Sequence, residues 1–186
     1  MKTEQTYFEN AISLKENMEA MKELKEECLS IYEAFQLPED TRLEEVASKK
    51  LHTLIIAEDW CGDAMLNNPI MRKIAEATNM DVRVVKRDED TTLIDRYLTN
   101  GGRAIPIYIF LDEKNEVVGK WGPRAPQLQQ FVMLQRQGLP AKEDPTFEEA
   151  QKEIHLKIMD GYLNNQSFWN EIYESLVSTI LELKNK

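Results

Sequence analysis

The stretch "LIIAEDWCGDAM", Leu54 to Met65, decides the fold. An apolar run typical of a buried strand leads into an acidic turn, and Trp60 and Cys61 come directly before residues that can begin a helix. The position where a second thiol would complete a Cys-x-x-Cys motif is occupied by Ala64. The stretch therefore predicts a thiol at a strand-to-helix junction that has no partner thiol in the same motif.

The segments that follow this junction alternate between strand and helix. An apolar run predicts a strand at 51–57, and valines that alternate with charged residues predict the next strand at 81–87. Two apolar runs around the polar turn 112–115 predict a β-hairpin. A helix lies between the first two strands, and Pro69 in its middle predicts a kink. Further helices are predicted over residues 88–100 and 125–138. This order indicates an α/β layer in which a parallel pair of strands is extended by an antiparallel pair.

Both ends of the chain are predicted to be helical. Apolar residues recur at helical spacing over 5–36, which predicts one amphipathic helix, and a short helix follows at 41–48. A charged linker precedes Thr146, which begins a helix that Gly161 can end. Ser167 can cap the last helix. These helices have apolar faces that need a partner to cover them.

Two motifs together resemble the thioredoxin family: "WCGD" after a buried strand and "AIPIYIF" before a hairpin. In that family the motif Trp-Cys-Gly-Pro-Cys opens a kinked helix. A cis-proline packs beside the cysteines, and a glycine in the loop after the hairpin lines the same groove. The resemblance gives these two roles to Ile105-Pro106 and to Gly122.

The resemblance implies an α/β thioredoxin-like fold with a mixed sheet of about four strands, flanking helices, and extra N-terminal and C-terminal helices. We expect one domain over residues 1–186, whose core is about 45–137. The helical extensions then cover 1–44 and 138–186.

The chain departs from the thioredoxin pattern at three positions. Ala64 replaces the family's resolving cysteine, Asp63 replaces the proline, and Ile55 stands where the family has a buried acid. A dithiol cycle at this motif is therefore ruled out. Cys28 could resolve an adduct of Cys61 from the added helix, but its place on an apolar face favours a buried core cysteine.

Opposing charges act on the Cys61 thiol. The start of a helix carries partial positive charge, which favours the thiolate and lowers the pKa of a cysteine. Three acids oppose this effect and two arginines can compensate them, namely Glu58, Asp59 and Asp63, and Arg103 and Arg124. Asp63 can be an acid–base partner of Cys61 or a plain helix-start carboxylate, and the second interpretation is favoured.

Two functions fit these residues. In the first, Cys61 is the solvent-facing nucleophile of a monothiol thiol–disulfide exchange that serves cell redox homeostasis, and an external thiol resolves the adduct. The alternative is a non-catalytic binding or scaffold module that holds an extended peptide beside the proline. Both place the substrate or peptide in a groove formed by Trp60, Gly62, Asp63, Ile105, Pro106 and Gly122.

The composition narrows the partners. The net charge of −10 argues against nucleic acid and an anionic membrane surface. No segment is apolar for long enough to span a bilayer, so the cytoplasm is the expected location. His52 and His155 lie far apart, so no metal or cofactor is expected. The expected partners are protein or low-molecular-weight thiols and disulfides.

Overall fold

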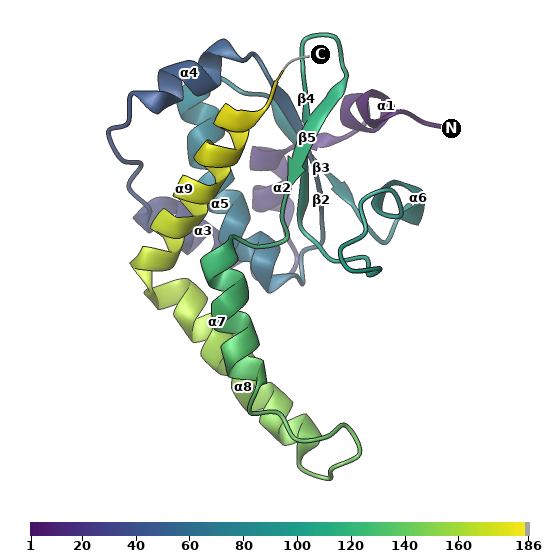
Figure 1. Cartoon of the computed structure of the whole chain (residues 1–186), viewed down its shortest axis with the longest axis vertical. Coiled ribbons are helices and arrows are strands. Elements are labelled where there is room, and N and C mark those ends of the chain that lie inside the picture. Colours follow the sequence, from purple (N-terminus) through teal and green to yellow (C-terminus); the bar gives the residue numbers. More distant parts are fainter. Residues whose placement is uncertain (185–186) are drawn as a thin grey trace.

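The computed structural model describes residues 1–184 and is built around a five-stranded mixed sheet (Figure 1). The strand order is β1-β3-β2-β4-β5. Only β2 and β3 run parallel, whereas the other neighbouring strands run antiparallel. The strands are β1 (Ile12–Ser13), β2 (His52–Ala57), β3 (Val82–Lys86), β4 (Ile107–Leu111) and β5 (Val117–Trp121). The predicted parallel pair with an antiparallel extension is thus confirmed.

The N-terminal segment differs from the single helix predicted over 5–36. It forms α1 (Glu4–Glu9), β1, α2 (Leu14–Ala20) and α3 (Lys25–Ala34). Ser13 is the reason for one break. Its hydroxyl accepts a hydrogen bond from the backbone N–H of Glu16, and the Glu16 carboxylate accepts one from the N–H of Ser13. This capping box starts a new helix, and the freed backbone at β1 adds a fifth strand beside β3.

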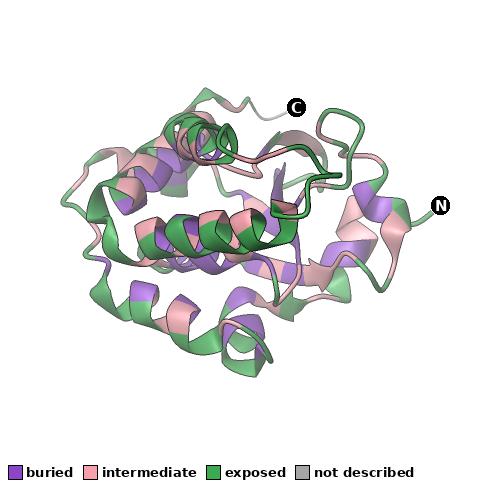
Figure 2. Ribbon diagram, turned by 90° about the horizontal axis from the view of Figure 1, so that it is seen from below, coloured by how far each residue is buried: buried purple, intermediate pink, exposed green. Residues whose placement is uncertain are grey.

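The remaining helices lie on both sides of the sheet. In Figure 1, α3, α4, α5 and α9 lie on one side, and α1 and α6 lie on the other. The helices α3, α4 and α9 all pack against α5. Figure 2 shows buried residues on the strands and on the inward sides of the helices. The bounds are α4 (Arg42–Ser48), α5 (Gly62–Thr78), α6 (Thr91–Ile94), α7 (Pro126–Arg136), α8 (Phe147–Asn164) and α9 (Gln166–Glu182).

The helix predicted over 88–100 shrinks to the four residues of α6. Side chains that follow α6 are bound by the N-terminal segment. Both Arg96 and Tyr97 donate hydrogen bonds to one carboxylate oxygen of Glu4, at 3.0 and 2.9 Å. These tertiary contacts hold the residues after α6 in a turn, which local helical spacing does not reveal.

The last two helices also end differently from the prediction. α8 runs through Gly161, which was expected to end it, and continues to Asn164. A Cβ at Gly161 would lie 2.9 Å from a ring carbon of Phe131, so this glycine serves the close contact of α8 with α7. Asn165, rather than Ser167, caps α9, and its side chain accepts a hydrogen bond from the Ser167 N–H.

The helices α7 and α8 form an arm that projects from the rest of the molecule (Figure 1). They pack side by side, and residues 137–146 connect them at the far end. We use "the arm" for α7, this connection and α8. The second half of α8 returns toward the sheet, where it contacts α5, and α9 then packs along α5.

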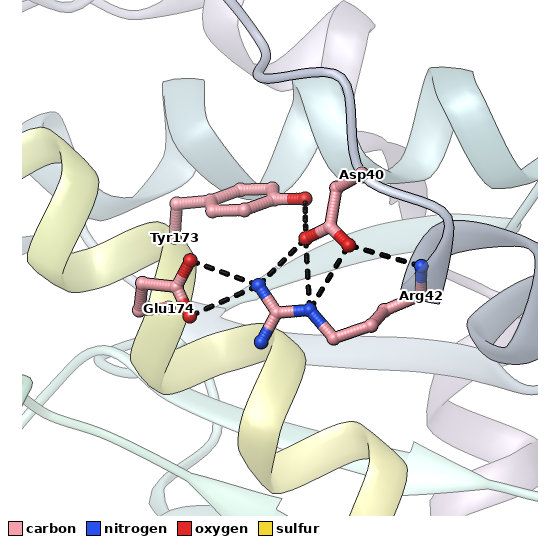
Figure 3. A network of polar contacts seen from close by, with 4 residues as sticks. All are labelled: Asp40, Arg42, Tyr173 and Glu174. Atoms are coloured by element: carbon pink, nitrogen blue, oxygen red, sulfur yellow. Dashed lines mark hydrogen bonds and ion pairs between the residues drawn. The ribbon is translucent and has the colours of Figure 1, made fainter.

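A polar network fastens α9 to the start of α4 (Figure 3). Arg42 pairs with Asp40 at 2.6 Å and with Glu174 at 2.9 Å, and the Tyr173 hydroxyl donates to Asp40 at 2.8 Å. The Asp40 side chain is only 11% exposed. The Arg42 guanidinium, with help from the hydroxyl of Tyr173, holds the pKa of Asp40 far below its usual range.

We predict that Asp40→Asn lowers the free energy of unfolding at pH 7 by about 1–2 kcal/mol, because charge-assisted hydrogen bonds to Arg42 are lost. The pKa of Asp40 is lowered in the folded protein, so its stabilisation is present above the unfolded value of about 4 and is lost as the pH falls below it. Denaturant titrations at pH 7 and pH 3 measure both effects. The control Glu174→Gln removes a more exposed partner and should cost about 0.5 kcal/mol or less. Equal midpoints for Asp40→Asn and wild type at pH 7 would contradict this role.

We also predict that the C-terminal helices complete the core of one cooperative unit. α9 buries six large side chains, Trp169, Ile172, Tyr173, Leu176, Val177 and Ile180. Each is worth about 1.5–3 kcal/mol when buried, so together they match the about 5–15 kcal/mol by which a whole domain is stable. A chain ending before Thr146 should bind a hydrophobic dye and lose its near-ultraviolet circular dichroism. A truncated chain that melts cooperatively at the temperature of the full chain would refute this prediction.

Candidate functional site

Cys61 lies where the sequence places it, between the end of β2 and the first turn of α5. It is the residue that directly precedes the helix, and its own backbone is extended, with φ −81° and ψ 114°. Its thiol contacts the carbonyl oxygen of Ile105, 3.5 Å from Sγ. The buried strand β2 thus holds the thiol at the carboxyl edge of the sheet, next to the segment that enters β4.

The peptide bond between Ile105 and Pro106 is cis. These two residues contact Cys61 on one side and Gly122 on the other. Cys61 contacts the carbonyl of Ile105, while Gly122 lies against the carbonyl of Pro106. A Cβ at Gly122 would lie 2.3 Å from that Pro106 oxygen, and the φ of Gly122 is +116°. The structure therefore brings the three segments that carry Cys61, Pro106 and Gly122 together.

The expectation that Cys61 faces solvent is wrong. Cys61 is 6% exposed, whereas its neighbour Trp60 is 47% exposed and carries the Arg87 guanidinium 5.0 Å above its ring centroid. The thiol is thus enclosed by protein, whereas the tryptophan beside it is exposed. The strand and turn before Cys61 do not indicate this enclosure.

α8 encloses the first turn of α5 from outside the thioredoxin-like core. A Cβ at Gly62 would meet the Met159 sulfur at 3.0 Å. The Tyr162 hydroxyl donates to Asp63 at 2.6 Å, and the indole N–H of Trp169 holds the carbonyl of Tyr162 at 2.8 Å. Sequence reasoning did not find Met159 and Tyr162. They lie about 100 positions from Cys61, and no local motif links them to the site.

Asp63 is held in an ion pair. Its carboxylate accepts from Arg124 at 2.8 Å as well as from Tyr162, and the side chains of Asp63 and Arg124 are 13% and 16% exposed. Burial lowers the pKa of Arg124, but the charge of Asp63 and the interactions with Asp63 and Tyr162 together raise it overall. Burial and the nearby Asp63 raise the pKa of Tyr162. With both partners in place, Asp63 fits the helix-start carboxylate better than an acid–base role toward Cys61.

The Cys61 thiol is protonated at neutral pH. Burial, and then the charge of Asp63, raise its pKa to about 11. Backbone hydrogen bonds from Ala64 and Asp63 and the charge of Arg124 lower the pKa, but by less. The helix start therefore does favour the thiolate, as expected, while enclosure dominates.

The other charges expected near the thiol are engaged elsewhere. Asp59 pairs with Lys86 and accepts from the backbone of Lys22, and Glu58 accepts from the backbone of Asp88. Arg103 pairs with Asp95 at 2.6 Å instead of compensating Cys61. Only Asp63 and Arg124, of the five charged residues considered, act on the pKa of Cys61.

Cys28 belongs to the core, as its apolar face indicated. It is free and 0% exposed, and burial raises its pKa to about 12. Ile55, at the position of the family's buried acid, pairs across the sheet with Tyr108. The fully buried Tyr108 hydroxyl donates to Asn68 at 2.5 Å. A phenol therefore stands opposite the position where the family has an acid.

Trp121 belongs to the core as well. It stacks edge-to-face on Tyr108 with a centroid distance of 5.2 Å, and its indole N–H donates to Ser175 of α9. Trp121 therefore covers the hairpin rather than forming a wall of the groove.

Among residues 1–184, no three acidic, histidine or cysteine side chains are grouped to hold a metal ion. In that same range no helix combines the length and the apolar character needed to cross a membrane.

Comparison with known proteins agrees with this architecture. A family model described as "Thioredoxin" matches residues 11–144, and the chain belongs to the thioredoxin family. No curated protein matches the chain. One similar solved structure is an HIV epitope-scaffold, with TM-score 0.62 and 16% identity over 97% of this chain and 96% of that one. Another is a protein of unknown function from Pseudomonas aeruginosa, with TM-score 0.60 and 18% identity over 87% of this chain and 99% of that one. Both likenesses concern the fold alone.

We predict that Gly122→Ala destabilises the protein by about 2 kcal/mol or more. A Cβ there collides with the Pro106 carbonyl, and the positive φ is unfavourable for alanine. The control is Gly138→Ala, where the nearest atom to the added Cβ is 3.9 Å away. Urea midpoints of the two variants measure the difference. Equal stabilities of the two variants would show that the contact at Pro106 can relax.

Proposed function

We propose that this thioredoxin-family protein carries out slow monothiol thiol–disulfide exchange through Cys61. The observation that carries the proposal is the position of its sulfur. It lies at the first turn of α5, is hydrogen-bonded by the backbone of Asp63 and Ala64, and touches the Ile105-Pro106 segment. Trp60, exposed beside it, offers a surface for the substrate.

The proposed reaction consists of two exchange steps at one cysteine. The Cys61 thiolate attacks one sulfur of a low-molecular-weight or protein disulfide, forms a mixed disulfide, and releases the other sulfur as a thiolate. Ala64 occupies the position of the internal resolving thiol, and Cys28 is fully buried. An external thiol therefore attacks the mixed disulfide at the sulfur that came from the substrate. The two external sulfurs leave as a new disulfide, and the Cys61 thiolate is regenerated. The two free cysteines fit a reducing compartment, which supports a cytoplasmic location.

The rate of attack is limited by protonation. With a pKa of about 11, roughly one Cys61 in 10,000 is thiolate at pH 7, against a few per cent for a free cysteine. A more basic thiolate is a better nucleophile, which recovers about tenfold. Cys61 should therefore react roughly 20-fold more slowly than a free thiol at pH 7.

A second candidate function is favoured by the same burial. A thiol that is 6% exposed and protonated can be a packing residue in a thioredoxin-fold module that binds without covalent chemistry. In this case the exposed Trp60 and the segment before Pro106 would hold a peptide, and Cys61 would only fill the space behind them.

We predict the pH profile of Cys61 with a disulfide reporter in the Cys28→Ala background. The rate should be about 20-fold below that of glutathione at pH 7 and should rise about tenfold per pH unit toward the pKa of about 11. Incubation with glutathione disulfide should give a glutathione adduct that mass spectrometry detects and that the Cys61→Ser variant lacks.

A variant with a resolving thiol separates the two functions. In Ala64→Cys, the mixed disulfide should be released internally, so the adduct should become short-lived and insulin reduction by thioredoxin reductase should appear. The unmodified protein should show little or no such activity. A Cys61 that captures no disulfide even at pH 10 would exclude the exchange and leave the binding module in its place.

A further inference from the structure

The arm carries a groove whose lining contains none of the residues of the Cys61 site. It has a volume of about 870 Å³ and lies between the end of α7, the connection and the first half of α8. Its apolar lining includes Leu139, Phe147, Ile154, Leu156 and Ile158. Neither the thioredoxin-family motifs nor the proposed exchange uses this part of the chain.

The charge of the groove is opposite to that of the whole protein. Its lining contains the basic side chains of Arg136, Lys142 and Lys152, together with His155, and no aspartate or glutamate. The whole chain, in contrast, has a net charge of −10. Glu153 is left out of the lining, because helical spacing puts it on the side of the helix opposite His155. Glu148, one turn before Lys152 on the same face, is left out as well.

These cations are available to a partner. Among the ion pairs of the described residues, none involves Arg136, Lys142 or Lys152. Lys142 and Lys152 are exposed, as is Arg136. Salt screens charges beyond about 8 Å at physiological ionic strength, so a group within the groove feels the cations of the lining more than the acids that lie outside the arm.

Apolar side chains on the arm are exposed to an unusual degree. Leu156 is 68% exposed, and Met133 and Leu134 on α7 are each 56% exposed. Exposed apolar residues that gather beside a groove mark an interaction surface more often than scattered ones do. The lining of the groove therefore offers apolar area together with basic side chains.

We propose that the groove of the arm binds an acidic amphipathic helix of a partner protein. Two packed antiparallel helices leave a groove between them that accepts the apolar face of a third helix. Glutamates and aspartates flanking that face would then meet Arg136, Lys142 and Lys152.

The test uses the full-length protein and two labelled synthetic peptides of about five helical turns. Both carry leucine at helical spacing on one face. In one peptide the remaining positions are mostly glutamate, and in the other they are mostly lysine. Fluorescence anisotropy should show that the acidic peptide binds at least about tenfold more tightly than the basic peptide, because only its charges complement the groove.

Protein variants connect the binding to the groove. The double variant Lys142→Glu/Lys152→Glu should weaken the acidic peptide at least about fivefold, and Leu156→Ser should weaken both peptides. The control Lys157→Glu changes the same kind of charge on the same helix outside the lining and should alter binding by less than about twofold. Circular dichroism checks that each variant keeps the helical content of the wild type.

Three results would overturn the proposal. The first is equal affinity of the two peptides for the wild type. The second is an affinity for the acidic peptide that the double variant leaves unchanged. The third is self-association in sedimentation that Leu156→Ser abolishes, which would assign the groove to a second copy of the chain. Substitution of Cys61 should not affect any of these measurements, so failure of the proposed exchange is distinguishable from failure of the groove.

Discussion

The packing of other helices around α5 is the constraint on which the rest of the structure depends. Twelve of the 17 residues of α5 are buried, although its sequence has only weak amphipathic character. α3 and α4 pack on it from the N-terminal half of the chain, and α8 and α9 return from the C-terminal end to cover it. The polar network of Asp40, Arg42, Tyr173 and Glu174 then fixes α9 in place (Figure 3). The helical extensions are therefore part of the arrangement that stabilises the thioredoxin-like core.

The same packing determines the chemistry at Cys61. The contacts of Met159 with Gly62 and of Tyr162 with Asp63 stabilise the first turn of α5, directly after Cys61. Enclosure removes water from the thiol, and this desolvation outweighs the favourable electrostatics of the helix start. Such a site suits slow exchange better than rapid turnover.

Much of the sheet could be predicted because its signals are local. Strands β2 to β5 were found from runs of apolar residues with polar turns between them, and the resemblance of two short motifs placed Pro106 and Gly122 near Cys61. The N-terminal helix was predicted too long, because apolar spacing alone does not show where Ser13 and Glu16 form a cap. The helix around α6 was also too long, because Glu4 binds the side chains that follow it.

The sequence by itself determined that one thiol stands at a strand-to-helix junction and that no second thiol stands within the motif, because both depend only on residue identity and local spacing. Only the tertiary structure decided that this thiol is enclosed and protonated. A pKa depends on every group that surrounds the sulfur, and here Arg124, and Tyr162 through its hydrogen bond to Asp63, come from about 60 to 100 positions away. No local pattern in the chain encodes those distances.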